Sequence, residues 1–193
     1  NLLNRSVAMI DKYCTGTVPT YGGAVNEVDG KLQEFIGQTI EKIEVAMEKL
    51  EFSVALTAIS QLISRTNKYI DETAPWVLAK SEDDKDKLNN VLYHLAENLR
   101  VVAALLQPFM RATSKKIFGQ LGLTEEEFSL EDLAFGYEFT HKVVEKGEPV
   151  FPRLDKEEEV EYIKLQMAGG KLPEKEWVPE DVKLNLTLPE IKF

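Results

Sequence analysis

A long apolar pattern fills residues 88–106, LNNVLYHLAENLRVVAALL. Its large apolar side chains recur every three or four residues, which is the spacing of one face of an α-helix. Just before it, Ser81 and the acidic residues that follow suit the capped, positive end of a helix dipole. Pro108 interrupts the pattern, which continues to Gly119. We therefore expect an amphipathic helix that starts near residue 81 and restarts or kinks at Pro108.

Three further segments have the same helical period, residues 1–13, 26–50 and 52–73. The connection at 15–23 holds three glycines and one proline, which predicts a loop. Several long amphipathic helices joined by short connections indicate an all-α helix bundle. For the helix at 52–73 the predicted buried side chains are Val54, Leu56, Ile59, Leu62, Ile63, Thr66 and Ile70.

The pattern becomes irregular after Gly119. Thr124 and Glu127 have capping-box spacing, which predicts a short helix there. Glycine and proline interrupt residues 130–150, which we expect either to wrap the bundle or to form short strands. Asp155 caps a last predicted helix, and alternation at 184–188 is typical of a strand. We predict a helical domain at 1–153, a C-terminal helix at 154–168, and a linker or tail at 169–193.

Composition narrows the class of protein. The chain has 193 residues, 44% of them hydrophobic, and a net charge of −10. Residues 1–122 hold 14 basic and 15 acidic side chains, whereas residues 123–193 hold 9 and 18, so the helical part is nearly neutral. A neutral module can bind nucleic acid through a local patch, with base contacts mattering more than phosphate contacts. No apolar run approaches the roughly 20 residues of a membrane span, and the lone Cys14 fits a reducing cytoplasm.

The first helix and a distant tryptophan could together form a binding surface. Asn1, Arg5, Ala8 and Lys12 share one stripe of the first helix, away from its apolar face. Pro75 should end the preceding helix and leave Trp76 at an element boundary. An indole beside guanidinium and amide groups is suited to unstacked RNA bases. Taken alone, these residues favour structural roles: a packed tryptophan, a surface ion pair and a helix cap.

Three short strings occur in order along the chain and carry a resemblance. They are Asn-Leu-Leu-Asn-Arg at 1–5, Ala-Pro-Trp at 74–76 with Lys80, and Phe-Pro-Arg at 151–153. Together they resemble the anticodon-binding domain of bacterial methionyl-tRNA synthetases, over residues 1 to about 168. The resemblance implies a class I synthetase helix bundle that recognises the anticodon of methionine tRNA.

The resemblance also assigns roles to particular residues. It implies that Asn1, Arg5 and Trp76 bind the anticodon, with Lys12 as a less selective addition. It implies that the chain is part of a longer methionine–tRNA ligase whose catalytic domain, ATP site and any zinc site lie outside this segment. Expected partners are the anticodon loop of methionine tRNA and the catalytic domain of the same polypeptide, without DNA or membrane.

Other chemistry finds little support in the sequence. His94 and His141 lie in no metal-ligand spacing, and the nucleotide-binding signatures of class I synthetases do not occur. We therefore expect no catalytic residue, metal or cofactor in this segment. One different class stays open, a helical scaffold that binds only protein through an exposed apolar stripe.

Overall fold

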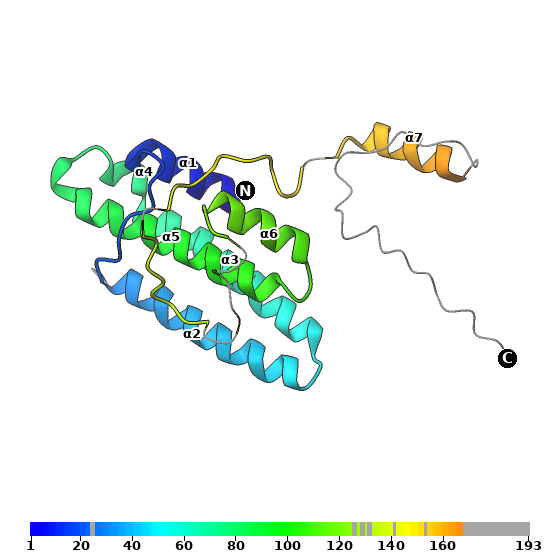
Figure 1. Cartoon of the computed structure of the whole chain (residues 1–193), viewed down its shortest axis with the longest axis horizontal. Coiled ribbons are helices and arrows are strands. Elements are labelled where there is room, and N and C mark those ends of the chain that lie inside the picture. The colour runs from blue at the N-terminus through cyan, green and yellow to red at the C-terminus, as the bar shows by residue number, and fades with distance from the viewer. Residues whose placement is uncertain are drawn as a thin grey trace. The chain divides into compact units, whose positions relative to one another are not determined.

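The computed structural model describes residues 1–23, 26–124, 127, 130, 133–140, 142–152 and 154–167. It divides into two compact units, residues 1–150 and residues 151–193, and each is described by itself. The first unit contains the helices α1 (Leu2–Cys14), α2 (Glu27–Glu48), α3 (Phe52–Thr73), α4 (Pro75–Leu78), η1 (Glu82–Asp84), α5 (Lys85–Leu106) and α6 (Arg111–Gln120). Figure 1 shows these helices packed side by side, which confirms the predicted all-α bundle. The predicted tail at 169–193 and the alternation at 184–188 lie outside the described residues.

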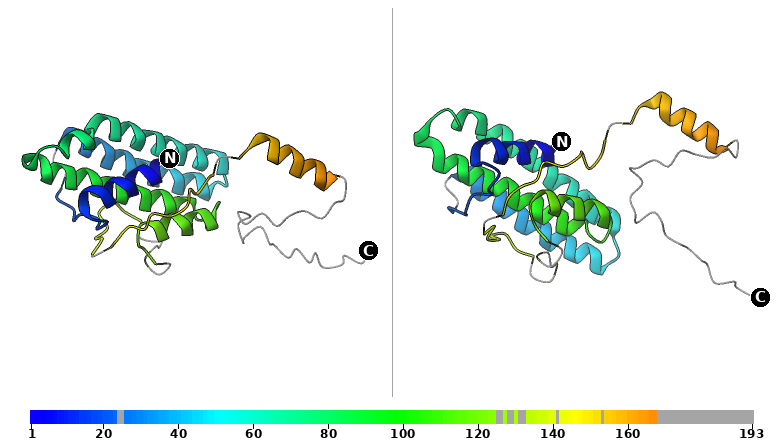
Figure 2. Two further views of the ribbon diagram at one scale, coloured as in Figure 1. Left: turned by 90° about the horizontal axis from the view of Figure 1, so that it is seen from above. Right: turned by 45° about the horizontal axis from the view of Figure 1, so that its top comes forward.

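Helix α5 is the central element of the bundle. The helices α1, α2, α3, α4 and α6 all pack against it, and the two views in Figure 2 show it surrounded by them. Every residue from Asn90 to Leu106 is buried, whether its side chain is apolar or polar. The predicted apolar stripe is buried, and the polar side of the helix is buried as well, because neighbouring helices also cover it. Buried polar groups need hydrogen-bond partners, and the polar side chains of α5 consequently organise the interior.

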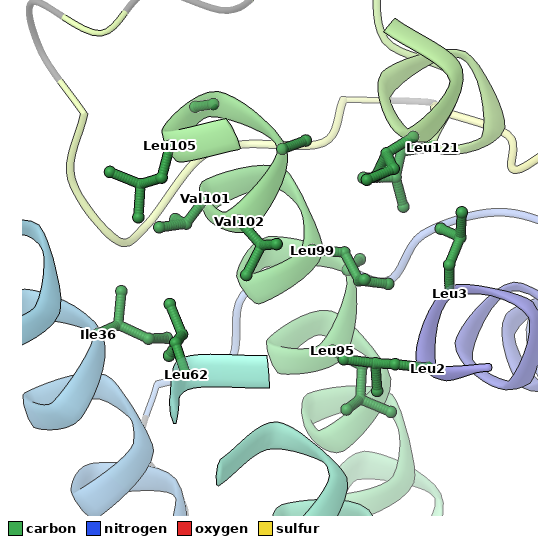
Figure 3. Close-up of a cluster of buried hydrophobic side chains, with 14 of the residues drawn as sticks. Leu2, Leu3, Ile36, Leu62, Leu95, Leu99, Val101, Val102, Leu105 and Leu121 are labelled. Carbon is green, nitrogen blue, oxygen red and sulfur yellow. The ribbon is translucent and has the colours of Figure 1, made fainter. Parts of the chain in front are cut away.

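Helix α1 docks on α5 through its apolar face. The side chains of Leu2, Leu3, Val7 and Ile10 are buried, as the sequence predicted. Figure 3 shows Leu2 beside Leu95, and Leu3 near Leu121 at the end of α6. Each such side chain contributes about 1.5–3 kcal/mol when it is fully buried. The opposite stripe of α1 is thereby left toward solvent.

Helices α2 and α3 form a hairpin whose contact face differs from the predicted one. Val54 and Leu56 are 38% and 39% exposed, so their predicted burial was wrong. The buried set is Ala55, Ala58, Ile59, Leu62, Thr66, Tyr69 and Ile70. These positions keep one helical phase, and their small alanines allow the two helices to pack closely near the hairpin tip. Burial follows helical phase here rather than side-chain size.

A buried hydrogen-bond network joins α2, α3 and α5. The Asp29 carboxylate accepts hydrogen bonds from the Tyr69 hydroxyl (2.7 Å) and the Asn90 amide (2.9 Å). His94 Nδ1 lies 2.7 Å from the Asn90 carbonyl, and its Nε2 lies 2.8 Å from the Gln33 amide nitrogen. A neutral imidazole with its hydrogen on Nδ1 satisfies both contacts. Burial lowers the pKa of His94, which favours this neutral form.

The irregular segment after α6 wraps the bundle and is held by a polar clamp, which we define as Glu97 and Arg100. The Arg100 Nε donates to the Glu97 carboxylate at 2.7 Å, and its Nη2 donates to the Ala134 carbonyl at 2.6 Å. Glu97 in turn accepts from the backbone N–H of Gly136 (2.9 Å) and of Tyr137 (3.1 Å). Within the described residues, the segment makes only an isolated β-bridge between Thr17 and Val143, so wrapping is the observed alternative.

The two helix starts predicted at Ser81 and Thr124 have different outcomes in the structure. Helix α5 starts at Lys85, one turn later than predicted, because η1 intervenes and the Ser81 side chain makes no capping hydrogen bond within η1. Glu127 does accept hydrogen bonds from the backbone N–H (2.8 Å) and hydroxyl (2.9 Å) of Thr124, although the helix predicted there falls on residues outside the described ones.

The second unit contains α7 (Lys156–Met167). Asp155 caps it by accepting hydrogen bonds from the backbone N–H groups of Glu157 (2.9 Å) and Glu158 (3.2 Å), as predicted. The apolar side chains of α7 are exposed, among them Val160, Ile163 and Met167. None of the described helices combines the length and apolar character needed to cross a bilayer.

Candidate nucleic-acid interface

A strained turn between α3 and α4 presents Trp76. Ala74 adopts a left-handed backbone conformation (φ 42°), which is uncommon for a residue other than glycine. The Ala74 N–H donates to the Ile70 carbonyl at 2.9 Å and so closes α3. Pro75 is buried as the first residue of α4, where its missing N–H costs nothing. Trp76 follows with 43% of its surface exposed, so the ring lies at an element boundary and remains open to solvent.

Arg5 joins α1 to the end of α3. Its Nη2 lies 3.8 Å from a carboxylate oxygen of Asp71, and the two side chains are 39% and 71% exposed. Asp71 is only five residues before Trp76 in the chain. An exposed ion pair of this length contributes little to stability. It does place the guanidinium beside the last turn of α3, which directly precedes the turn at Ala74.

Asn1 occupies the N-cap position of α1 but does not use its side chain as a cap. Its backbone carbonyl accepts from the Arg5 N–H at 3.0 Å, while its side chain makes no capping hydrogen bond to the described helix. The simple capping role that the sequence left open is therefore not what the structure shows. Asn1 is exposed one helical turn from Arg5, on the stripe that the sequence predicted.

Lys12 lies at the other end of this stripe. It is seven residues beyond Arg5, which is about 10 Å along the helix. It is exposed, and its ammonium lies 5.2 Å from the centre of the Tyr13 ring. The neighbouring Cys14 thiol donates to the Asn89 side chain at 3.5 Å, so this end of α1 lies beside the start of α5. Lys12 is therefore exposed about two helical turns from Arg5, near the carboxyl end of α1.

The structure thus leaves all four predicted residues accessible. Figure 1 shows α1 and α4 at the same end of the bundle, and both pack on α5. We call Asn1, Arg5, Lys12 and Trp76 the recognition surface. Whether these residues bind RNA stays a prediction, but none of them is withdrawn into the core.

The sequence alone assigned no role to the two acidic residues in the last turn of α3, Asp71 and Glu72. Their charge is mildly unfavourable at a helix carboxyl end, and the structure shows what balances it. Asp71 faces Arg5, while Glu72 accepts from Arg65 at 3.0 Å and lies 3.7 Å from Lys68. The only available sequence signal was the position of two acids directly before the Ala-Pro-Trp string. Asp71 thus lies beside Arg5, and Glu72 pairs with cations of its own helix.

The sequence matches the model of one protein family over most of its length. The model of the anticodon-binding domain of methionyl-tRNA ligase matches residues 18–171. The chain belongs to this family. The methionine–tRNA ligase of Lactococcus lactis subsp. lactis is 70% identical over 193 residues, and that of Bacillus subtilis is 52% identical over 193 residues. The two alignments cover 100% and 99% of this chain, respectively, but only 29% of each relative.

Solved structures agree with this family. The free form of Mycobacterium tuberculosis methionyl-tRNA synthetase matches with a TM-score of 0.73 and 31% sequence identity, over 80% of this chain and 31% of that one. The same synthetase bound by methionyl-adenylate matches with a TM-score of 0.71 and 31% identity, over 79% and 30% of the two chains. The helix bundle of this anticodon-binding domain is thus found as one part of larger synthetases.

Proposed function

We propose that the chain recognises the anticodon of methionine tRNA as part of a cytoplasmic methionine–tRNA ligase. The observation that carries the proposal is the exposed Trp76, presented by a strained turn beside the Arg5–Asp71 pair. Strain at a turn persists only where surrounding structure maintains it, and such strain is concentrated at functional sites. Family membership supports the same function.

In the proposed mechanism, the anticodon loop presents its bases splayed away from their stack. One base stacks on the Trp76 indole, a contact that contributes about 1–3 kcal/mol. Arg5 and Asn1 hydrogen-bond to base edges, since a guanidinium and an amide offer directed donors and acceptors. Lys12 adds attraction to phosphate with less selectivity.

Asp71 makes the arrangement partly preorganised. Because its carboxylate already lies 3.8 Å from the Arg5 guanidinium, the long arginine side chain loses less rotational freedom when it binds a base. This contact is long and exposed enough for the guanidinium to retain free donors. Aminoacylation itself would be carried out by the catalytic domain of the same polypeptide, with its ATP and any metal.

If the chain were instead a scaffold that binds only protein, the expected roles of these residues would differ. A protein partner would require neither an accessible indole nor Arg5 held beside the α3–α4 turn. The pairing of Arg5 with Asp71, close in sequence to Trp76, favours the RNA proposal.

Binding of anticodon stem-loops to the 193-residue chain tests the proposal. A stem-loop with the anticodon CAU is compared with stem-loops that differ at one anticodon base. We expect the CAU stem-loop to bind at least tenfold more tightly than the altered ones. Equal affinity for all stem-loops would contradict anticodon recognition and would favour a role in protein binding.

A further inference from the structure

Helix α6 lies in a part of the chain that is unusually free of negative charge. Residues 98–124 contain no Asp or Glu, in a chain that has 33 of them. The cations in this stretch are Arg100, Arg111, Lys115 and Lys116. Arg100 is buried and paired with Glu97 in the polar clamp, so the other three cations, all on α6, carry the remaining positive charge.

The packing of α6 directs this charge outward. The Ser114 hydroxyl donates to the Ala103 carbonyl of α5 at 2.6 Å, and Ile117 and Phe118 are buried. Arg111 and Lys116 are exposed, together with Lys115. Residues four apart share one side of a helix, so Arg111 and Lys115 form a row on adjacent turns, with Lys116 next to it. We call these three residues the α6 basic face.

Many cations elsewhere on the bundle are neutralised by neighbours. Lys31 pairs with Glu27 at 2.5 Å, and Lys142 with Glu127 at 2.6 Å. Among the described residues, by contrast, no ion pair joins Arg111 or Lys116 to a carboxylate. The strongly acidic remainder of the chain does not cancel this local field, because exposed charges are screened beyond about 8 Å at physiological salt.

A hollow of about 290 Å³ extends the basic face at the carboxyl end of α6. Lys116 and Lys146 both line it, and the Gln120 amide donates to the Glu148 carbonyl at 3.0 Å to hold its wall. Glu145 and Glu148 also line the hollow, so its two lysines and two glutamates carry no net formal charge. Lys146 therefore adds one cation beside the basic face, but the hollow as a whole adds no net positive charge, which stays on the helix.

The carboxyl end of α6, where the basic face finishes, is close to the amino end of α1, where the recognition surface starts. Leu3 lies near Leu121, the residue after α6, as Figure 3 shows. Figures 1 and 2 agree that the amino end of α1 lies beside α6. A ligand bound at Asn1 and Arg5 would therefore extend within reach of α6 if it were longer than a few nucleotides.

We propose that the α6 basic face, assisted by Lys146, binds the sugar–phosphate backbone of the same RNA outside its anticodon bases. This inference rests on the proposed function, since it assigns a second contact to the same ligand. Phosphate contacts supply affinity that depends on salt and carry no sequence information. The two surfaces would thus divide the work: the recognition surface discriminates between anticodons, and α6 increases affinity for any tRNA.

The test uses the full chain with the double substitution Arg111→Gln and Lys116→Gln. The matched control is Lys42→Gln with Lys49→Gln, which removes two exposed lysines at α2 and its carboxyl end. Affinity for methionine tRNA is measured over a range of salt concentrations. We expect the α6 variant to bind about three- to tenfold more weakly, and its salt slope to fall by about one for each phosphate that it no longer neutralises. The control should behave as the wild type.

Two further measurements separate this inference from the proposed function. The affinity ratio between CAU and altered anticodons should be unchanged in the α6 variant, and the charge-preserving pair Arg111→Lys with Lys116→Arg should restore tight binding. An α6 variant with the affinity and salt slope of the control would overturn the inference. A wild-type chain that binds tRNA without discriminating anticodons would count against the proposed function alone, since the salt slopes would still decide the role of α6.

Discussion

The polar clamp and the Arg5–Asp71 pair are both arginine–carboxylate contacts, but they differ in almost every physical respect. The clamp residues Arg100 and Glu97 are 6% and 0% exposed and lie 2.7 Å apart, whereas Arg5 and Asp71 are 39% and 71% exposed and lie 3.8 Å apart. In the clamp, backbone groups use the remaining hydrogen-bonding capacity. For the Arg5–Asp71 pair, no backbone group is found to hydrogen-bond to either side chain among the described residues. The difference separates a pair that builds the fold from a pair that is available to a ligand.

The largest expected effect comes from breaking the clamp. Glu97→Ala leaves the Arg100 guanidinium buried without its carboxylate partner and removes the acceptor of the Gly136 and Tyr137 N–H groups. We expect a loss of about 3–5 kcal/mol in the free energy of unfolding, measured by urea denaturation. The matched control is Glu72→Ala, which removes the carboxylate of a more exposed arginine pair and should cost less than about 1 kcal/mol. Similar losses in the two variants would show that burial does not distinguish them.

The second effect concerns binding rather than stability. Trp76→Ala removes an exposed ring, so we expect at least a tenfold loss of affinity for the CAU stem-loop with about 1 kcal/mol or less lost in stability. Phe52→Ala is the matched control, because Phe52 is 48% exposed and packs edge-on to Phe109 at the hairpin tip. That variant should retain wild-type affinity. If both variants bind equally well, Trp76 is not a stacking platform.

A third prediction sharpens the contrast by changing pH. Because burial lowers the pKa of His94 below its value of about 6.5 in an unfolded chain, the unfolded state takes up the proton first as pH falls. Stability is therefore retained above about pH 6.5 and declines below it, by at most about 1.4 kcal/mol per pH unit, until the folded protein also binds the proton. Urea unfolding between about pH 7.5 and 5.5 measures this slope. His94→Asn should flatten it, and an unchanged slope would assign the effect to another group.

The smallest expected effect tests the exposed pair itself. Asp71→Ala should change the free energy of unfolding by less than about 1 kcal/mol, because the pair is long and solvated. A double-mutant cycle with Arg5→Ala gives the coupling between the two side chains, which we also expect to be below about 1 kcal/mol. A coupling as large as the cost of breaking the clamp would place Arg5 among the residues that build the fold.

Helix boundaries were more predictable than the faces that the helices bury. The sequence predicted a helix at residues 52–73, which is the observed extent of α3, because Pro75 fixes its end. The exposure of Val54 and Leu56 could not be predicted from their size, since burial depends on where α2 packs. The all-round burial of α5 likewise depends on how many helices surround it.

The candidate site shows the same division between local and long-range information. The position of Trp76 at an element boundary followed from the adjacent proline, a local signal, and the structure confirms it. The contact between Arg5 and Asp71 spans 66 positions in the chain and exists only because α1 docks beside the end of α3. Asp71 could therefore be noticed in the sequence but not assigned a partner.

The burial of α5 on all sides has a mechanical consequence. A 22-residue helix is about 33 Å long, and neighbours enclose this one on every side from Asn90 to Leu106. The backbone hydrogen bonds inside this stretch can therefore open only when the surrounding helices separate from it.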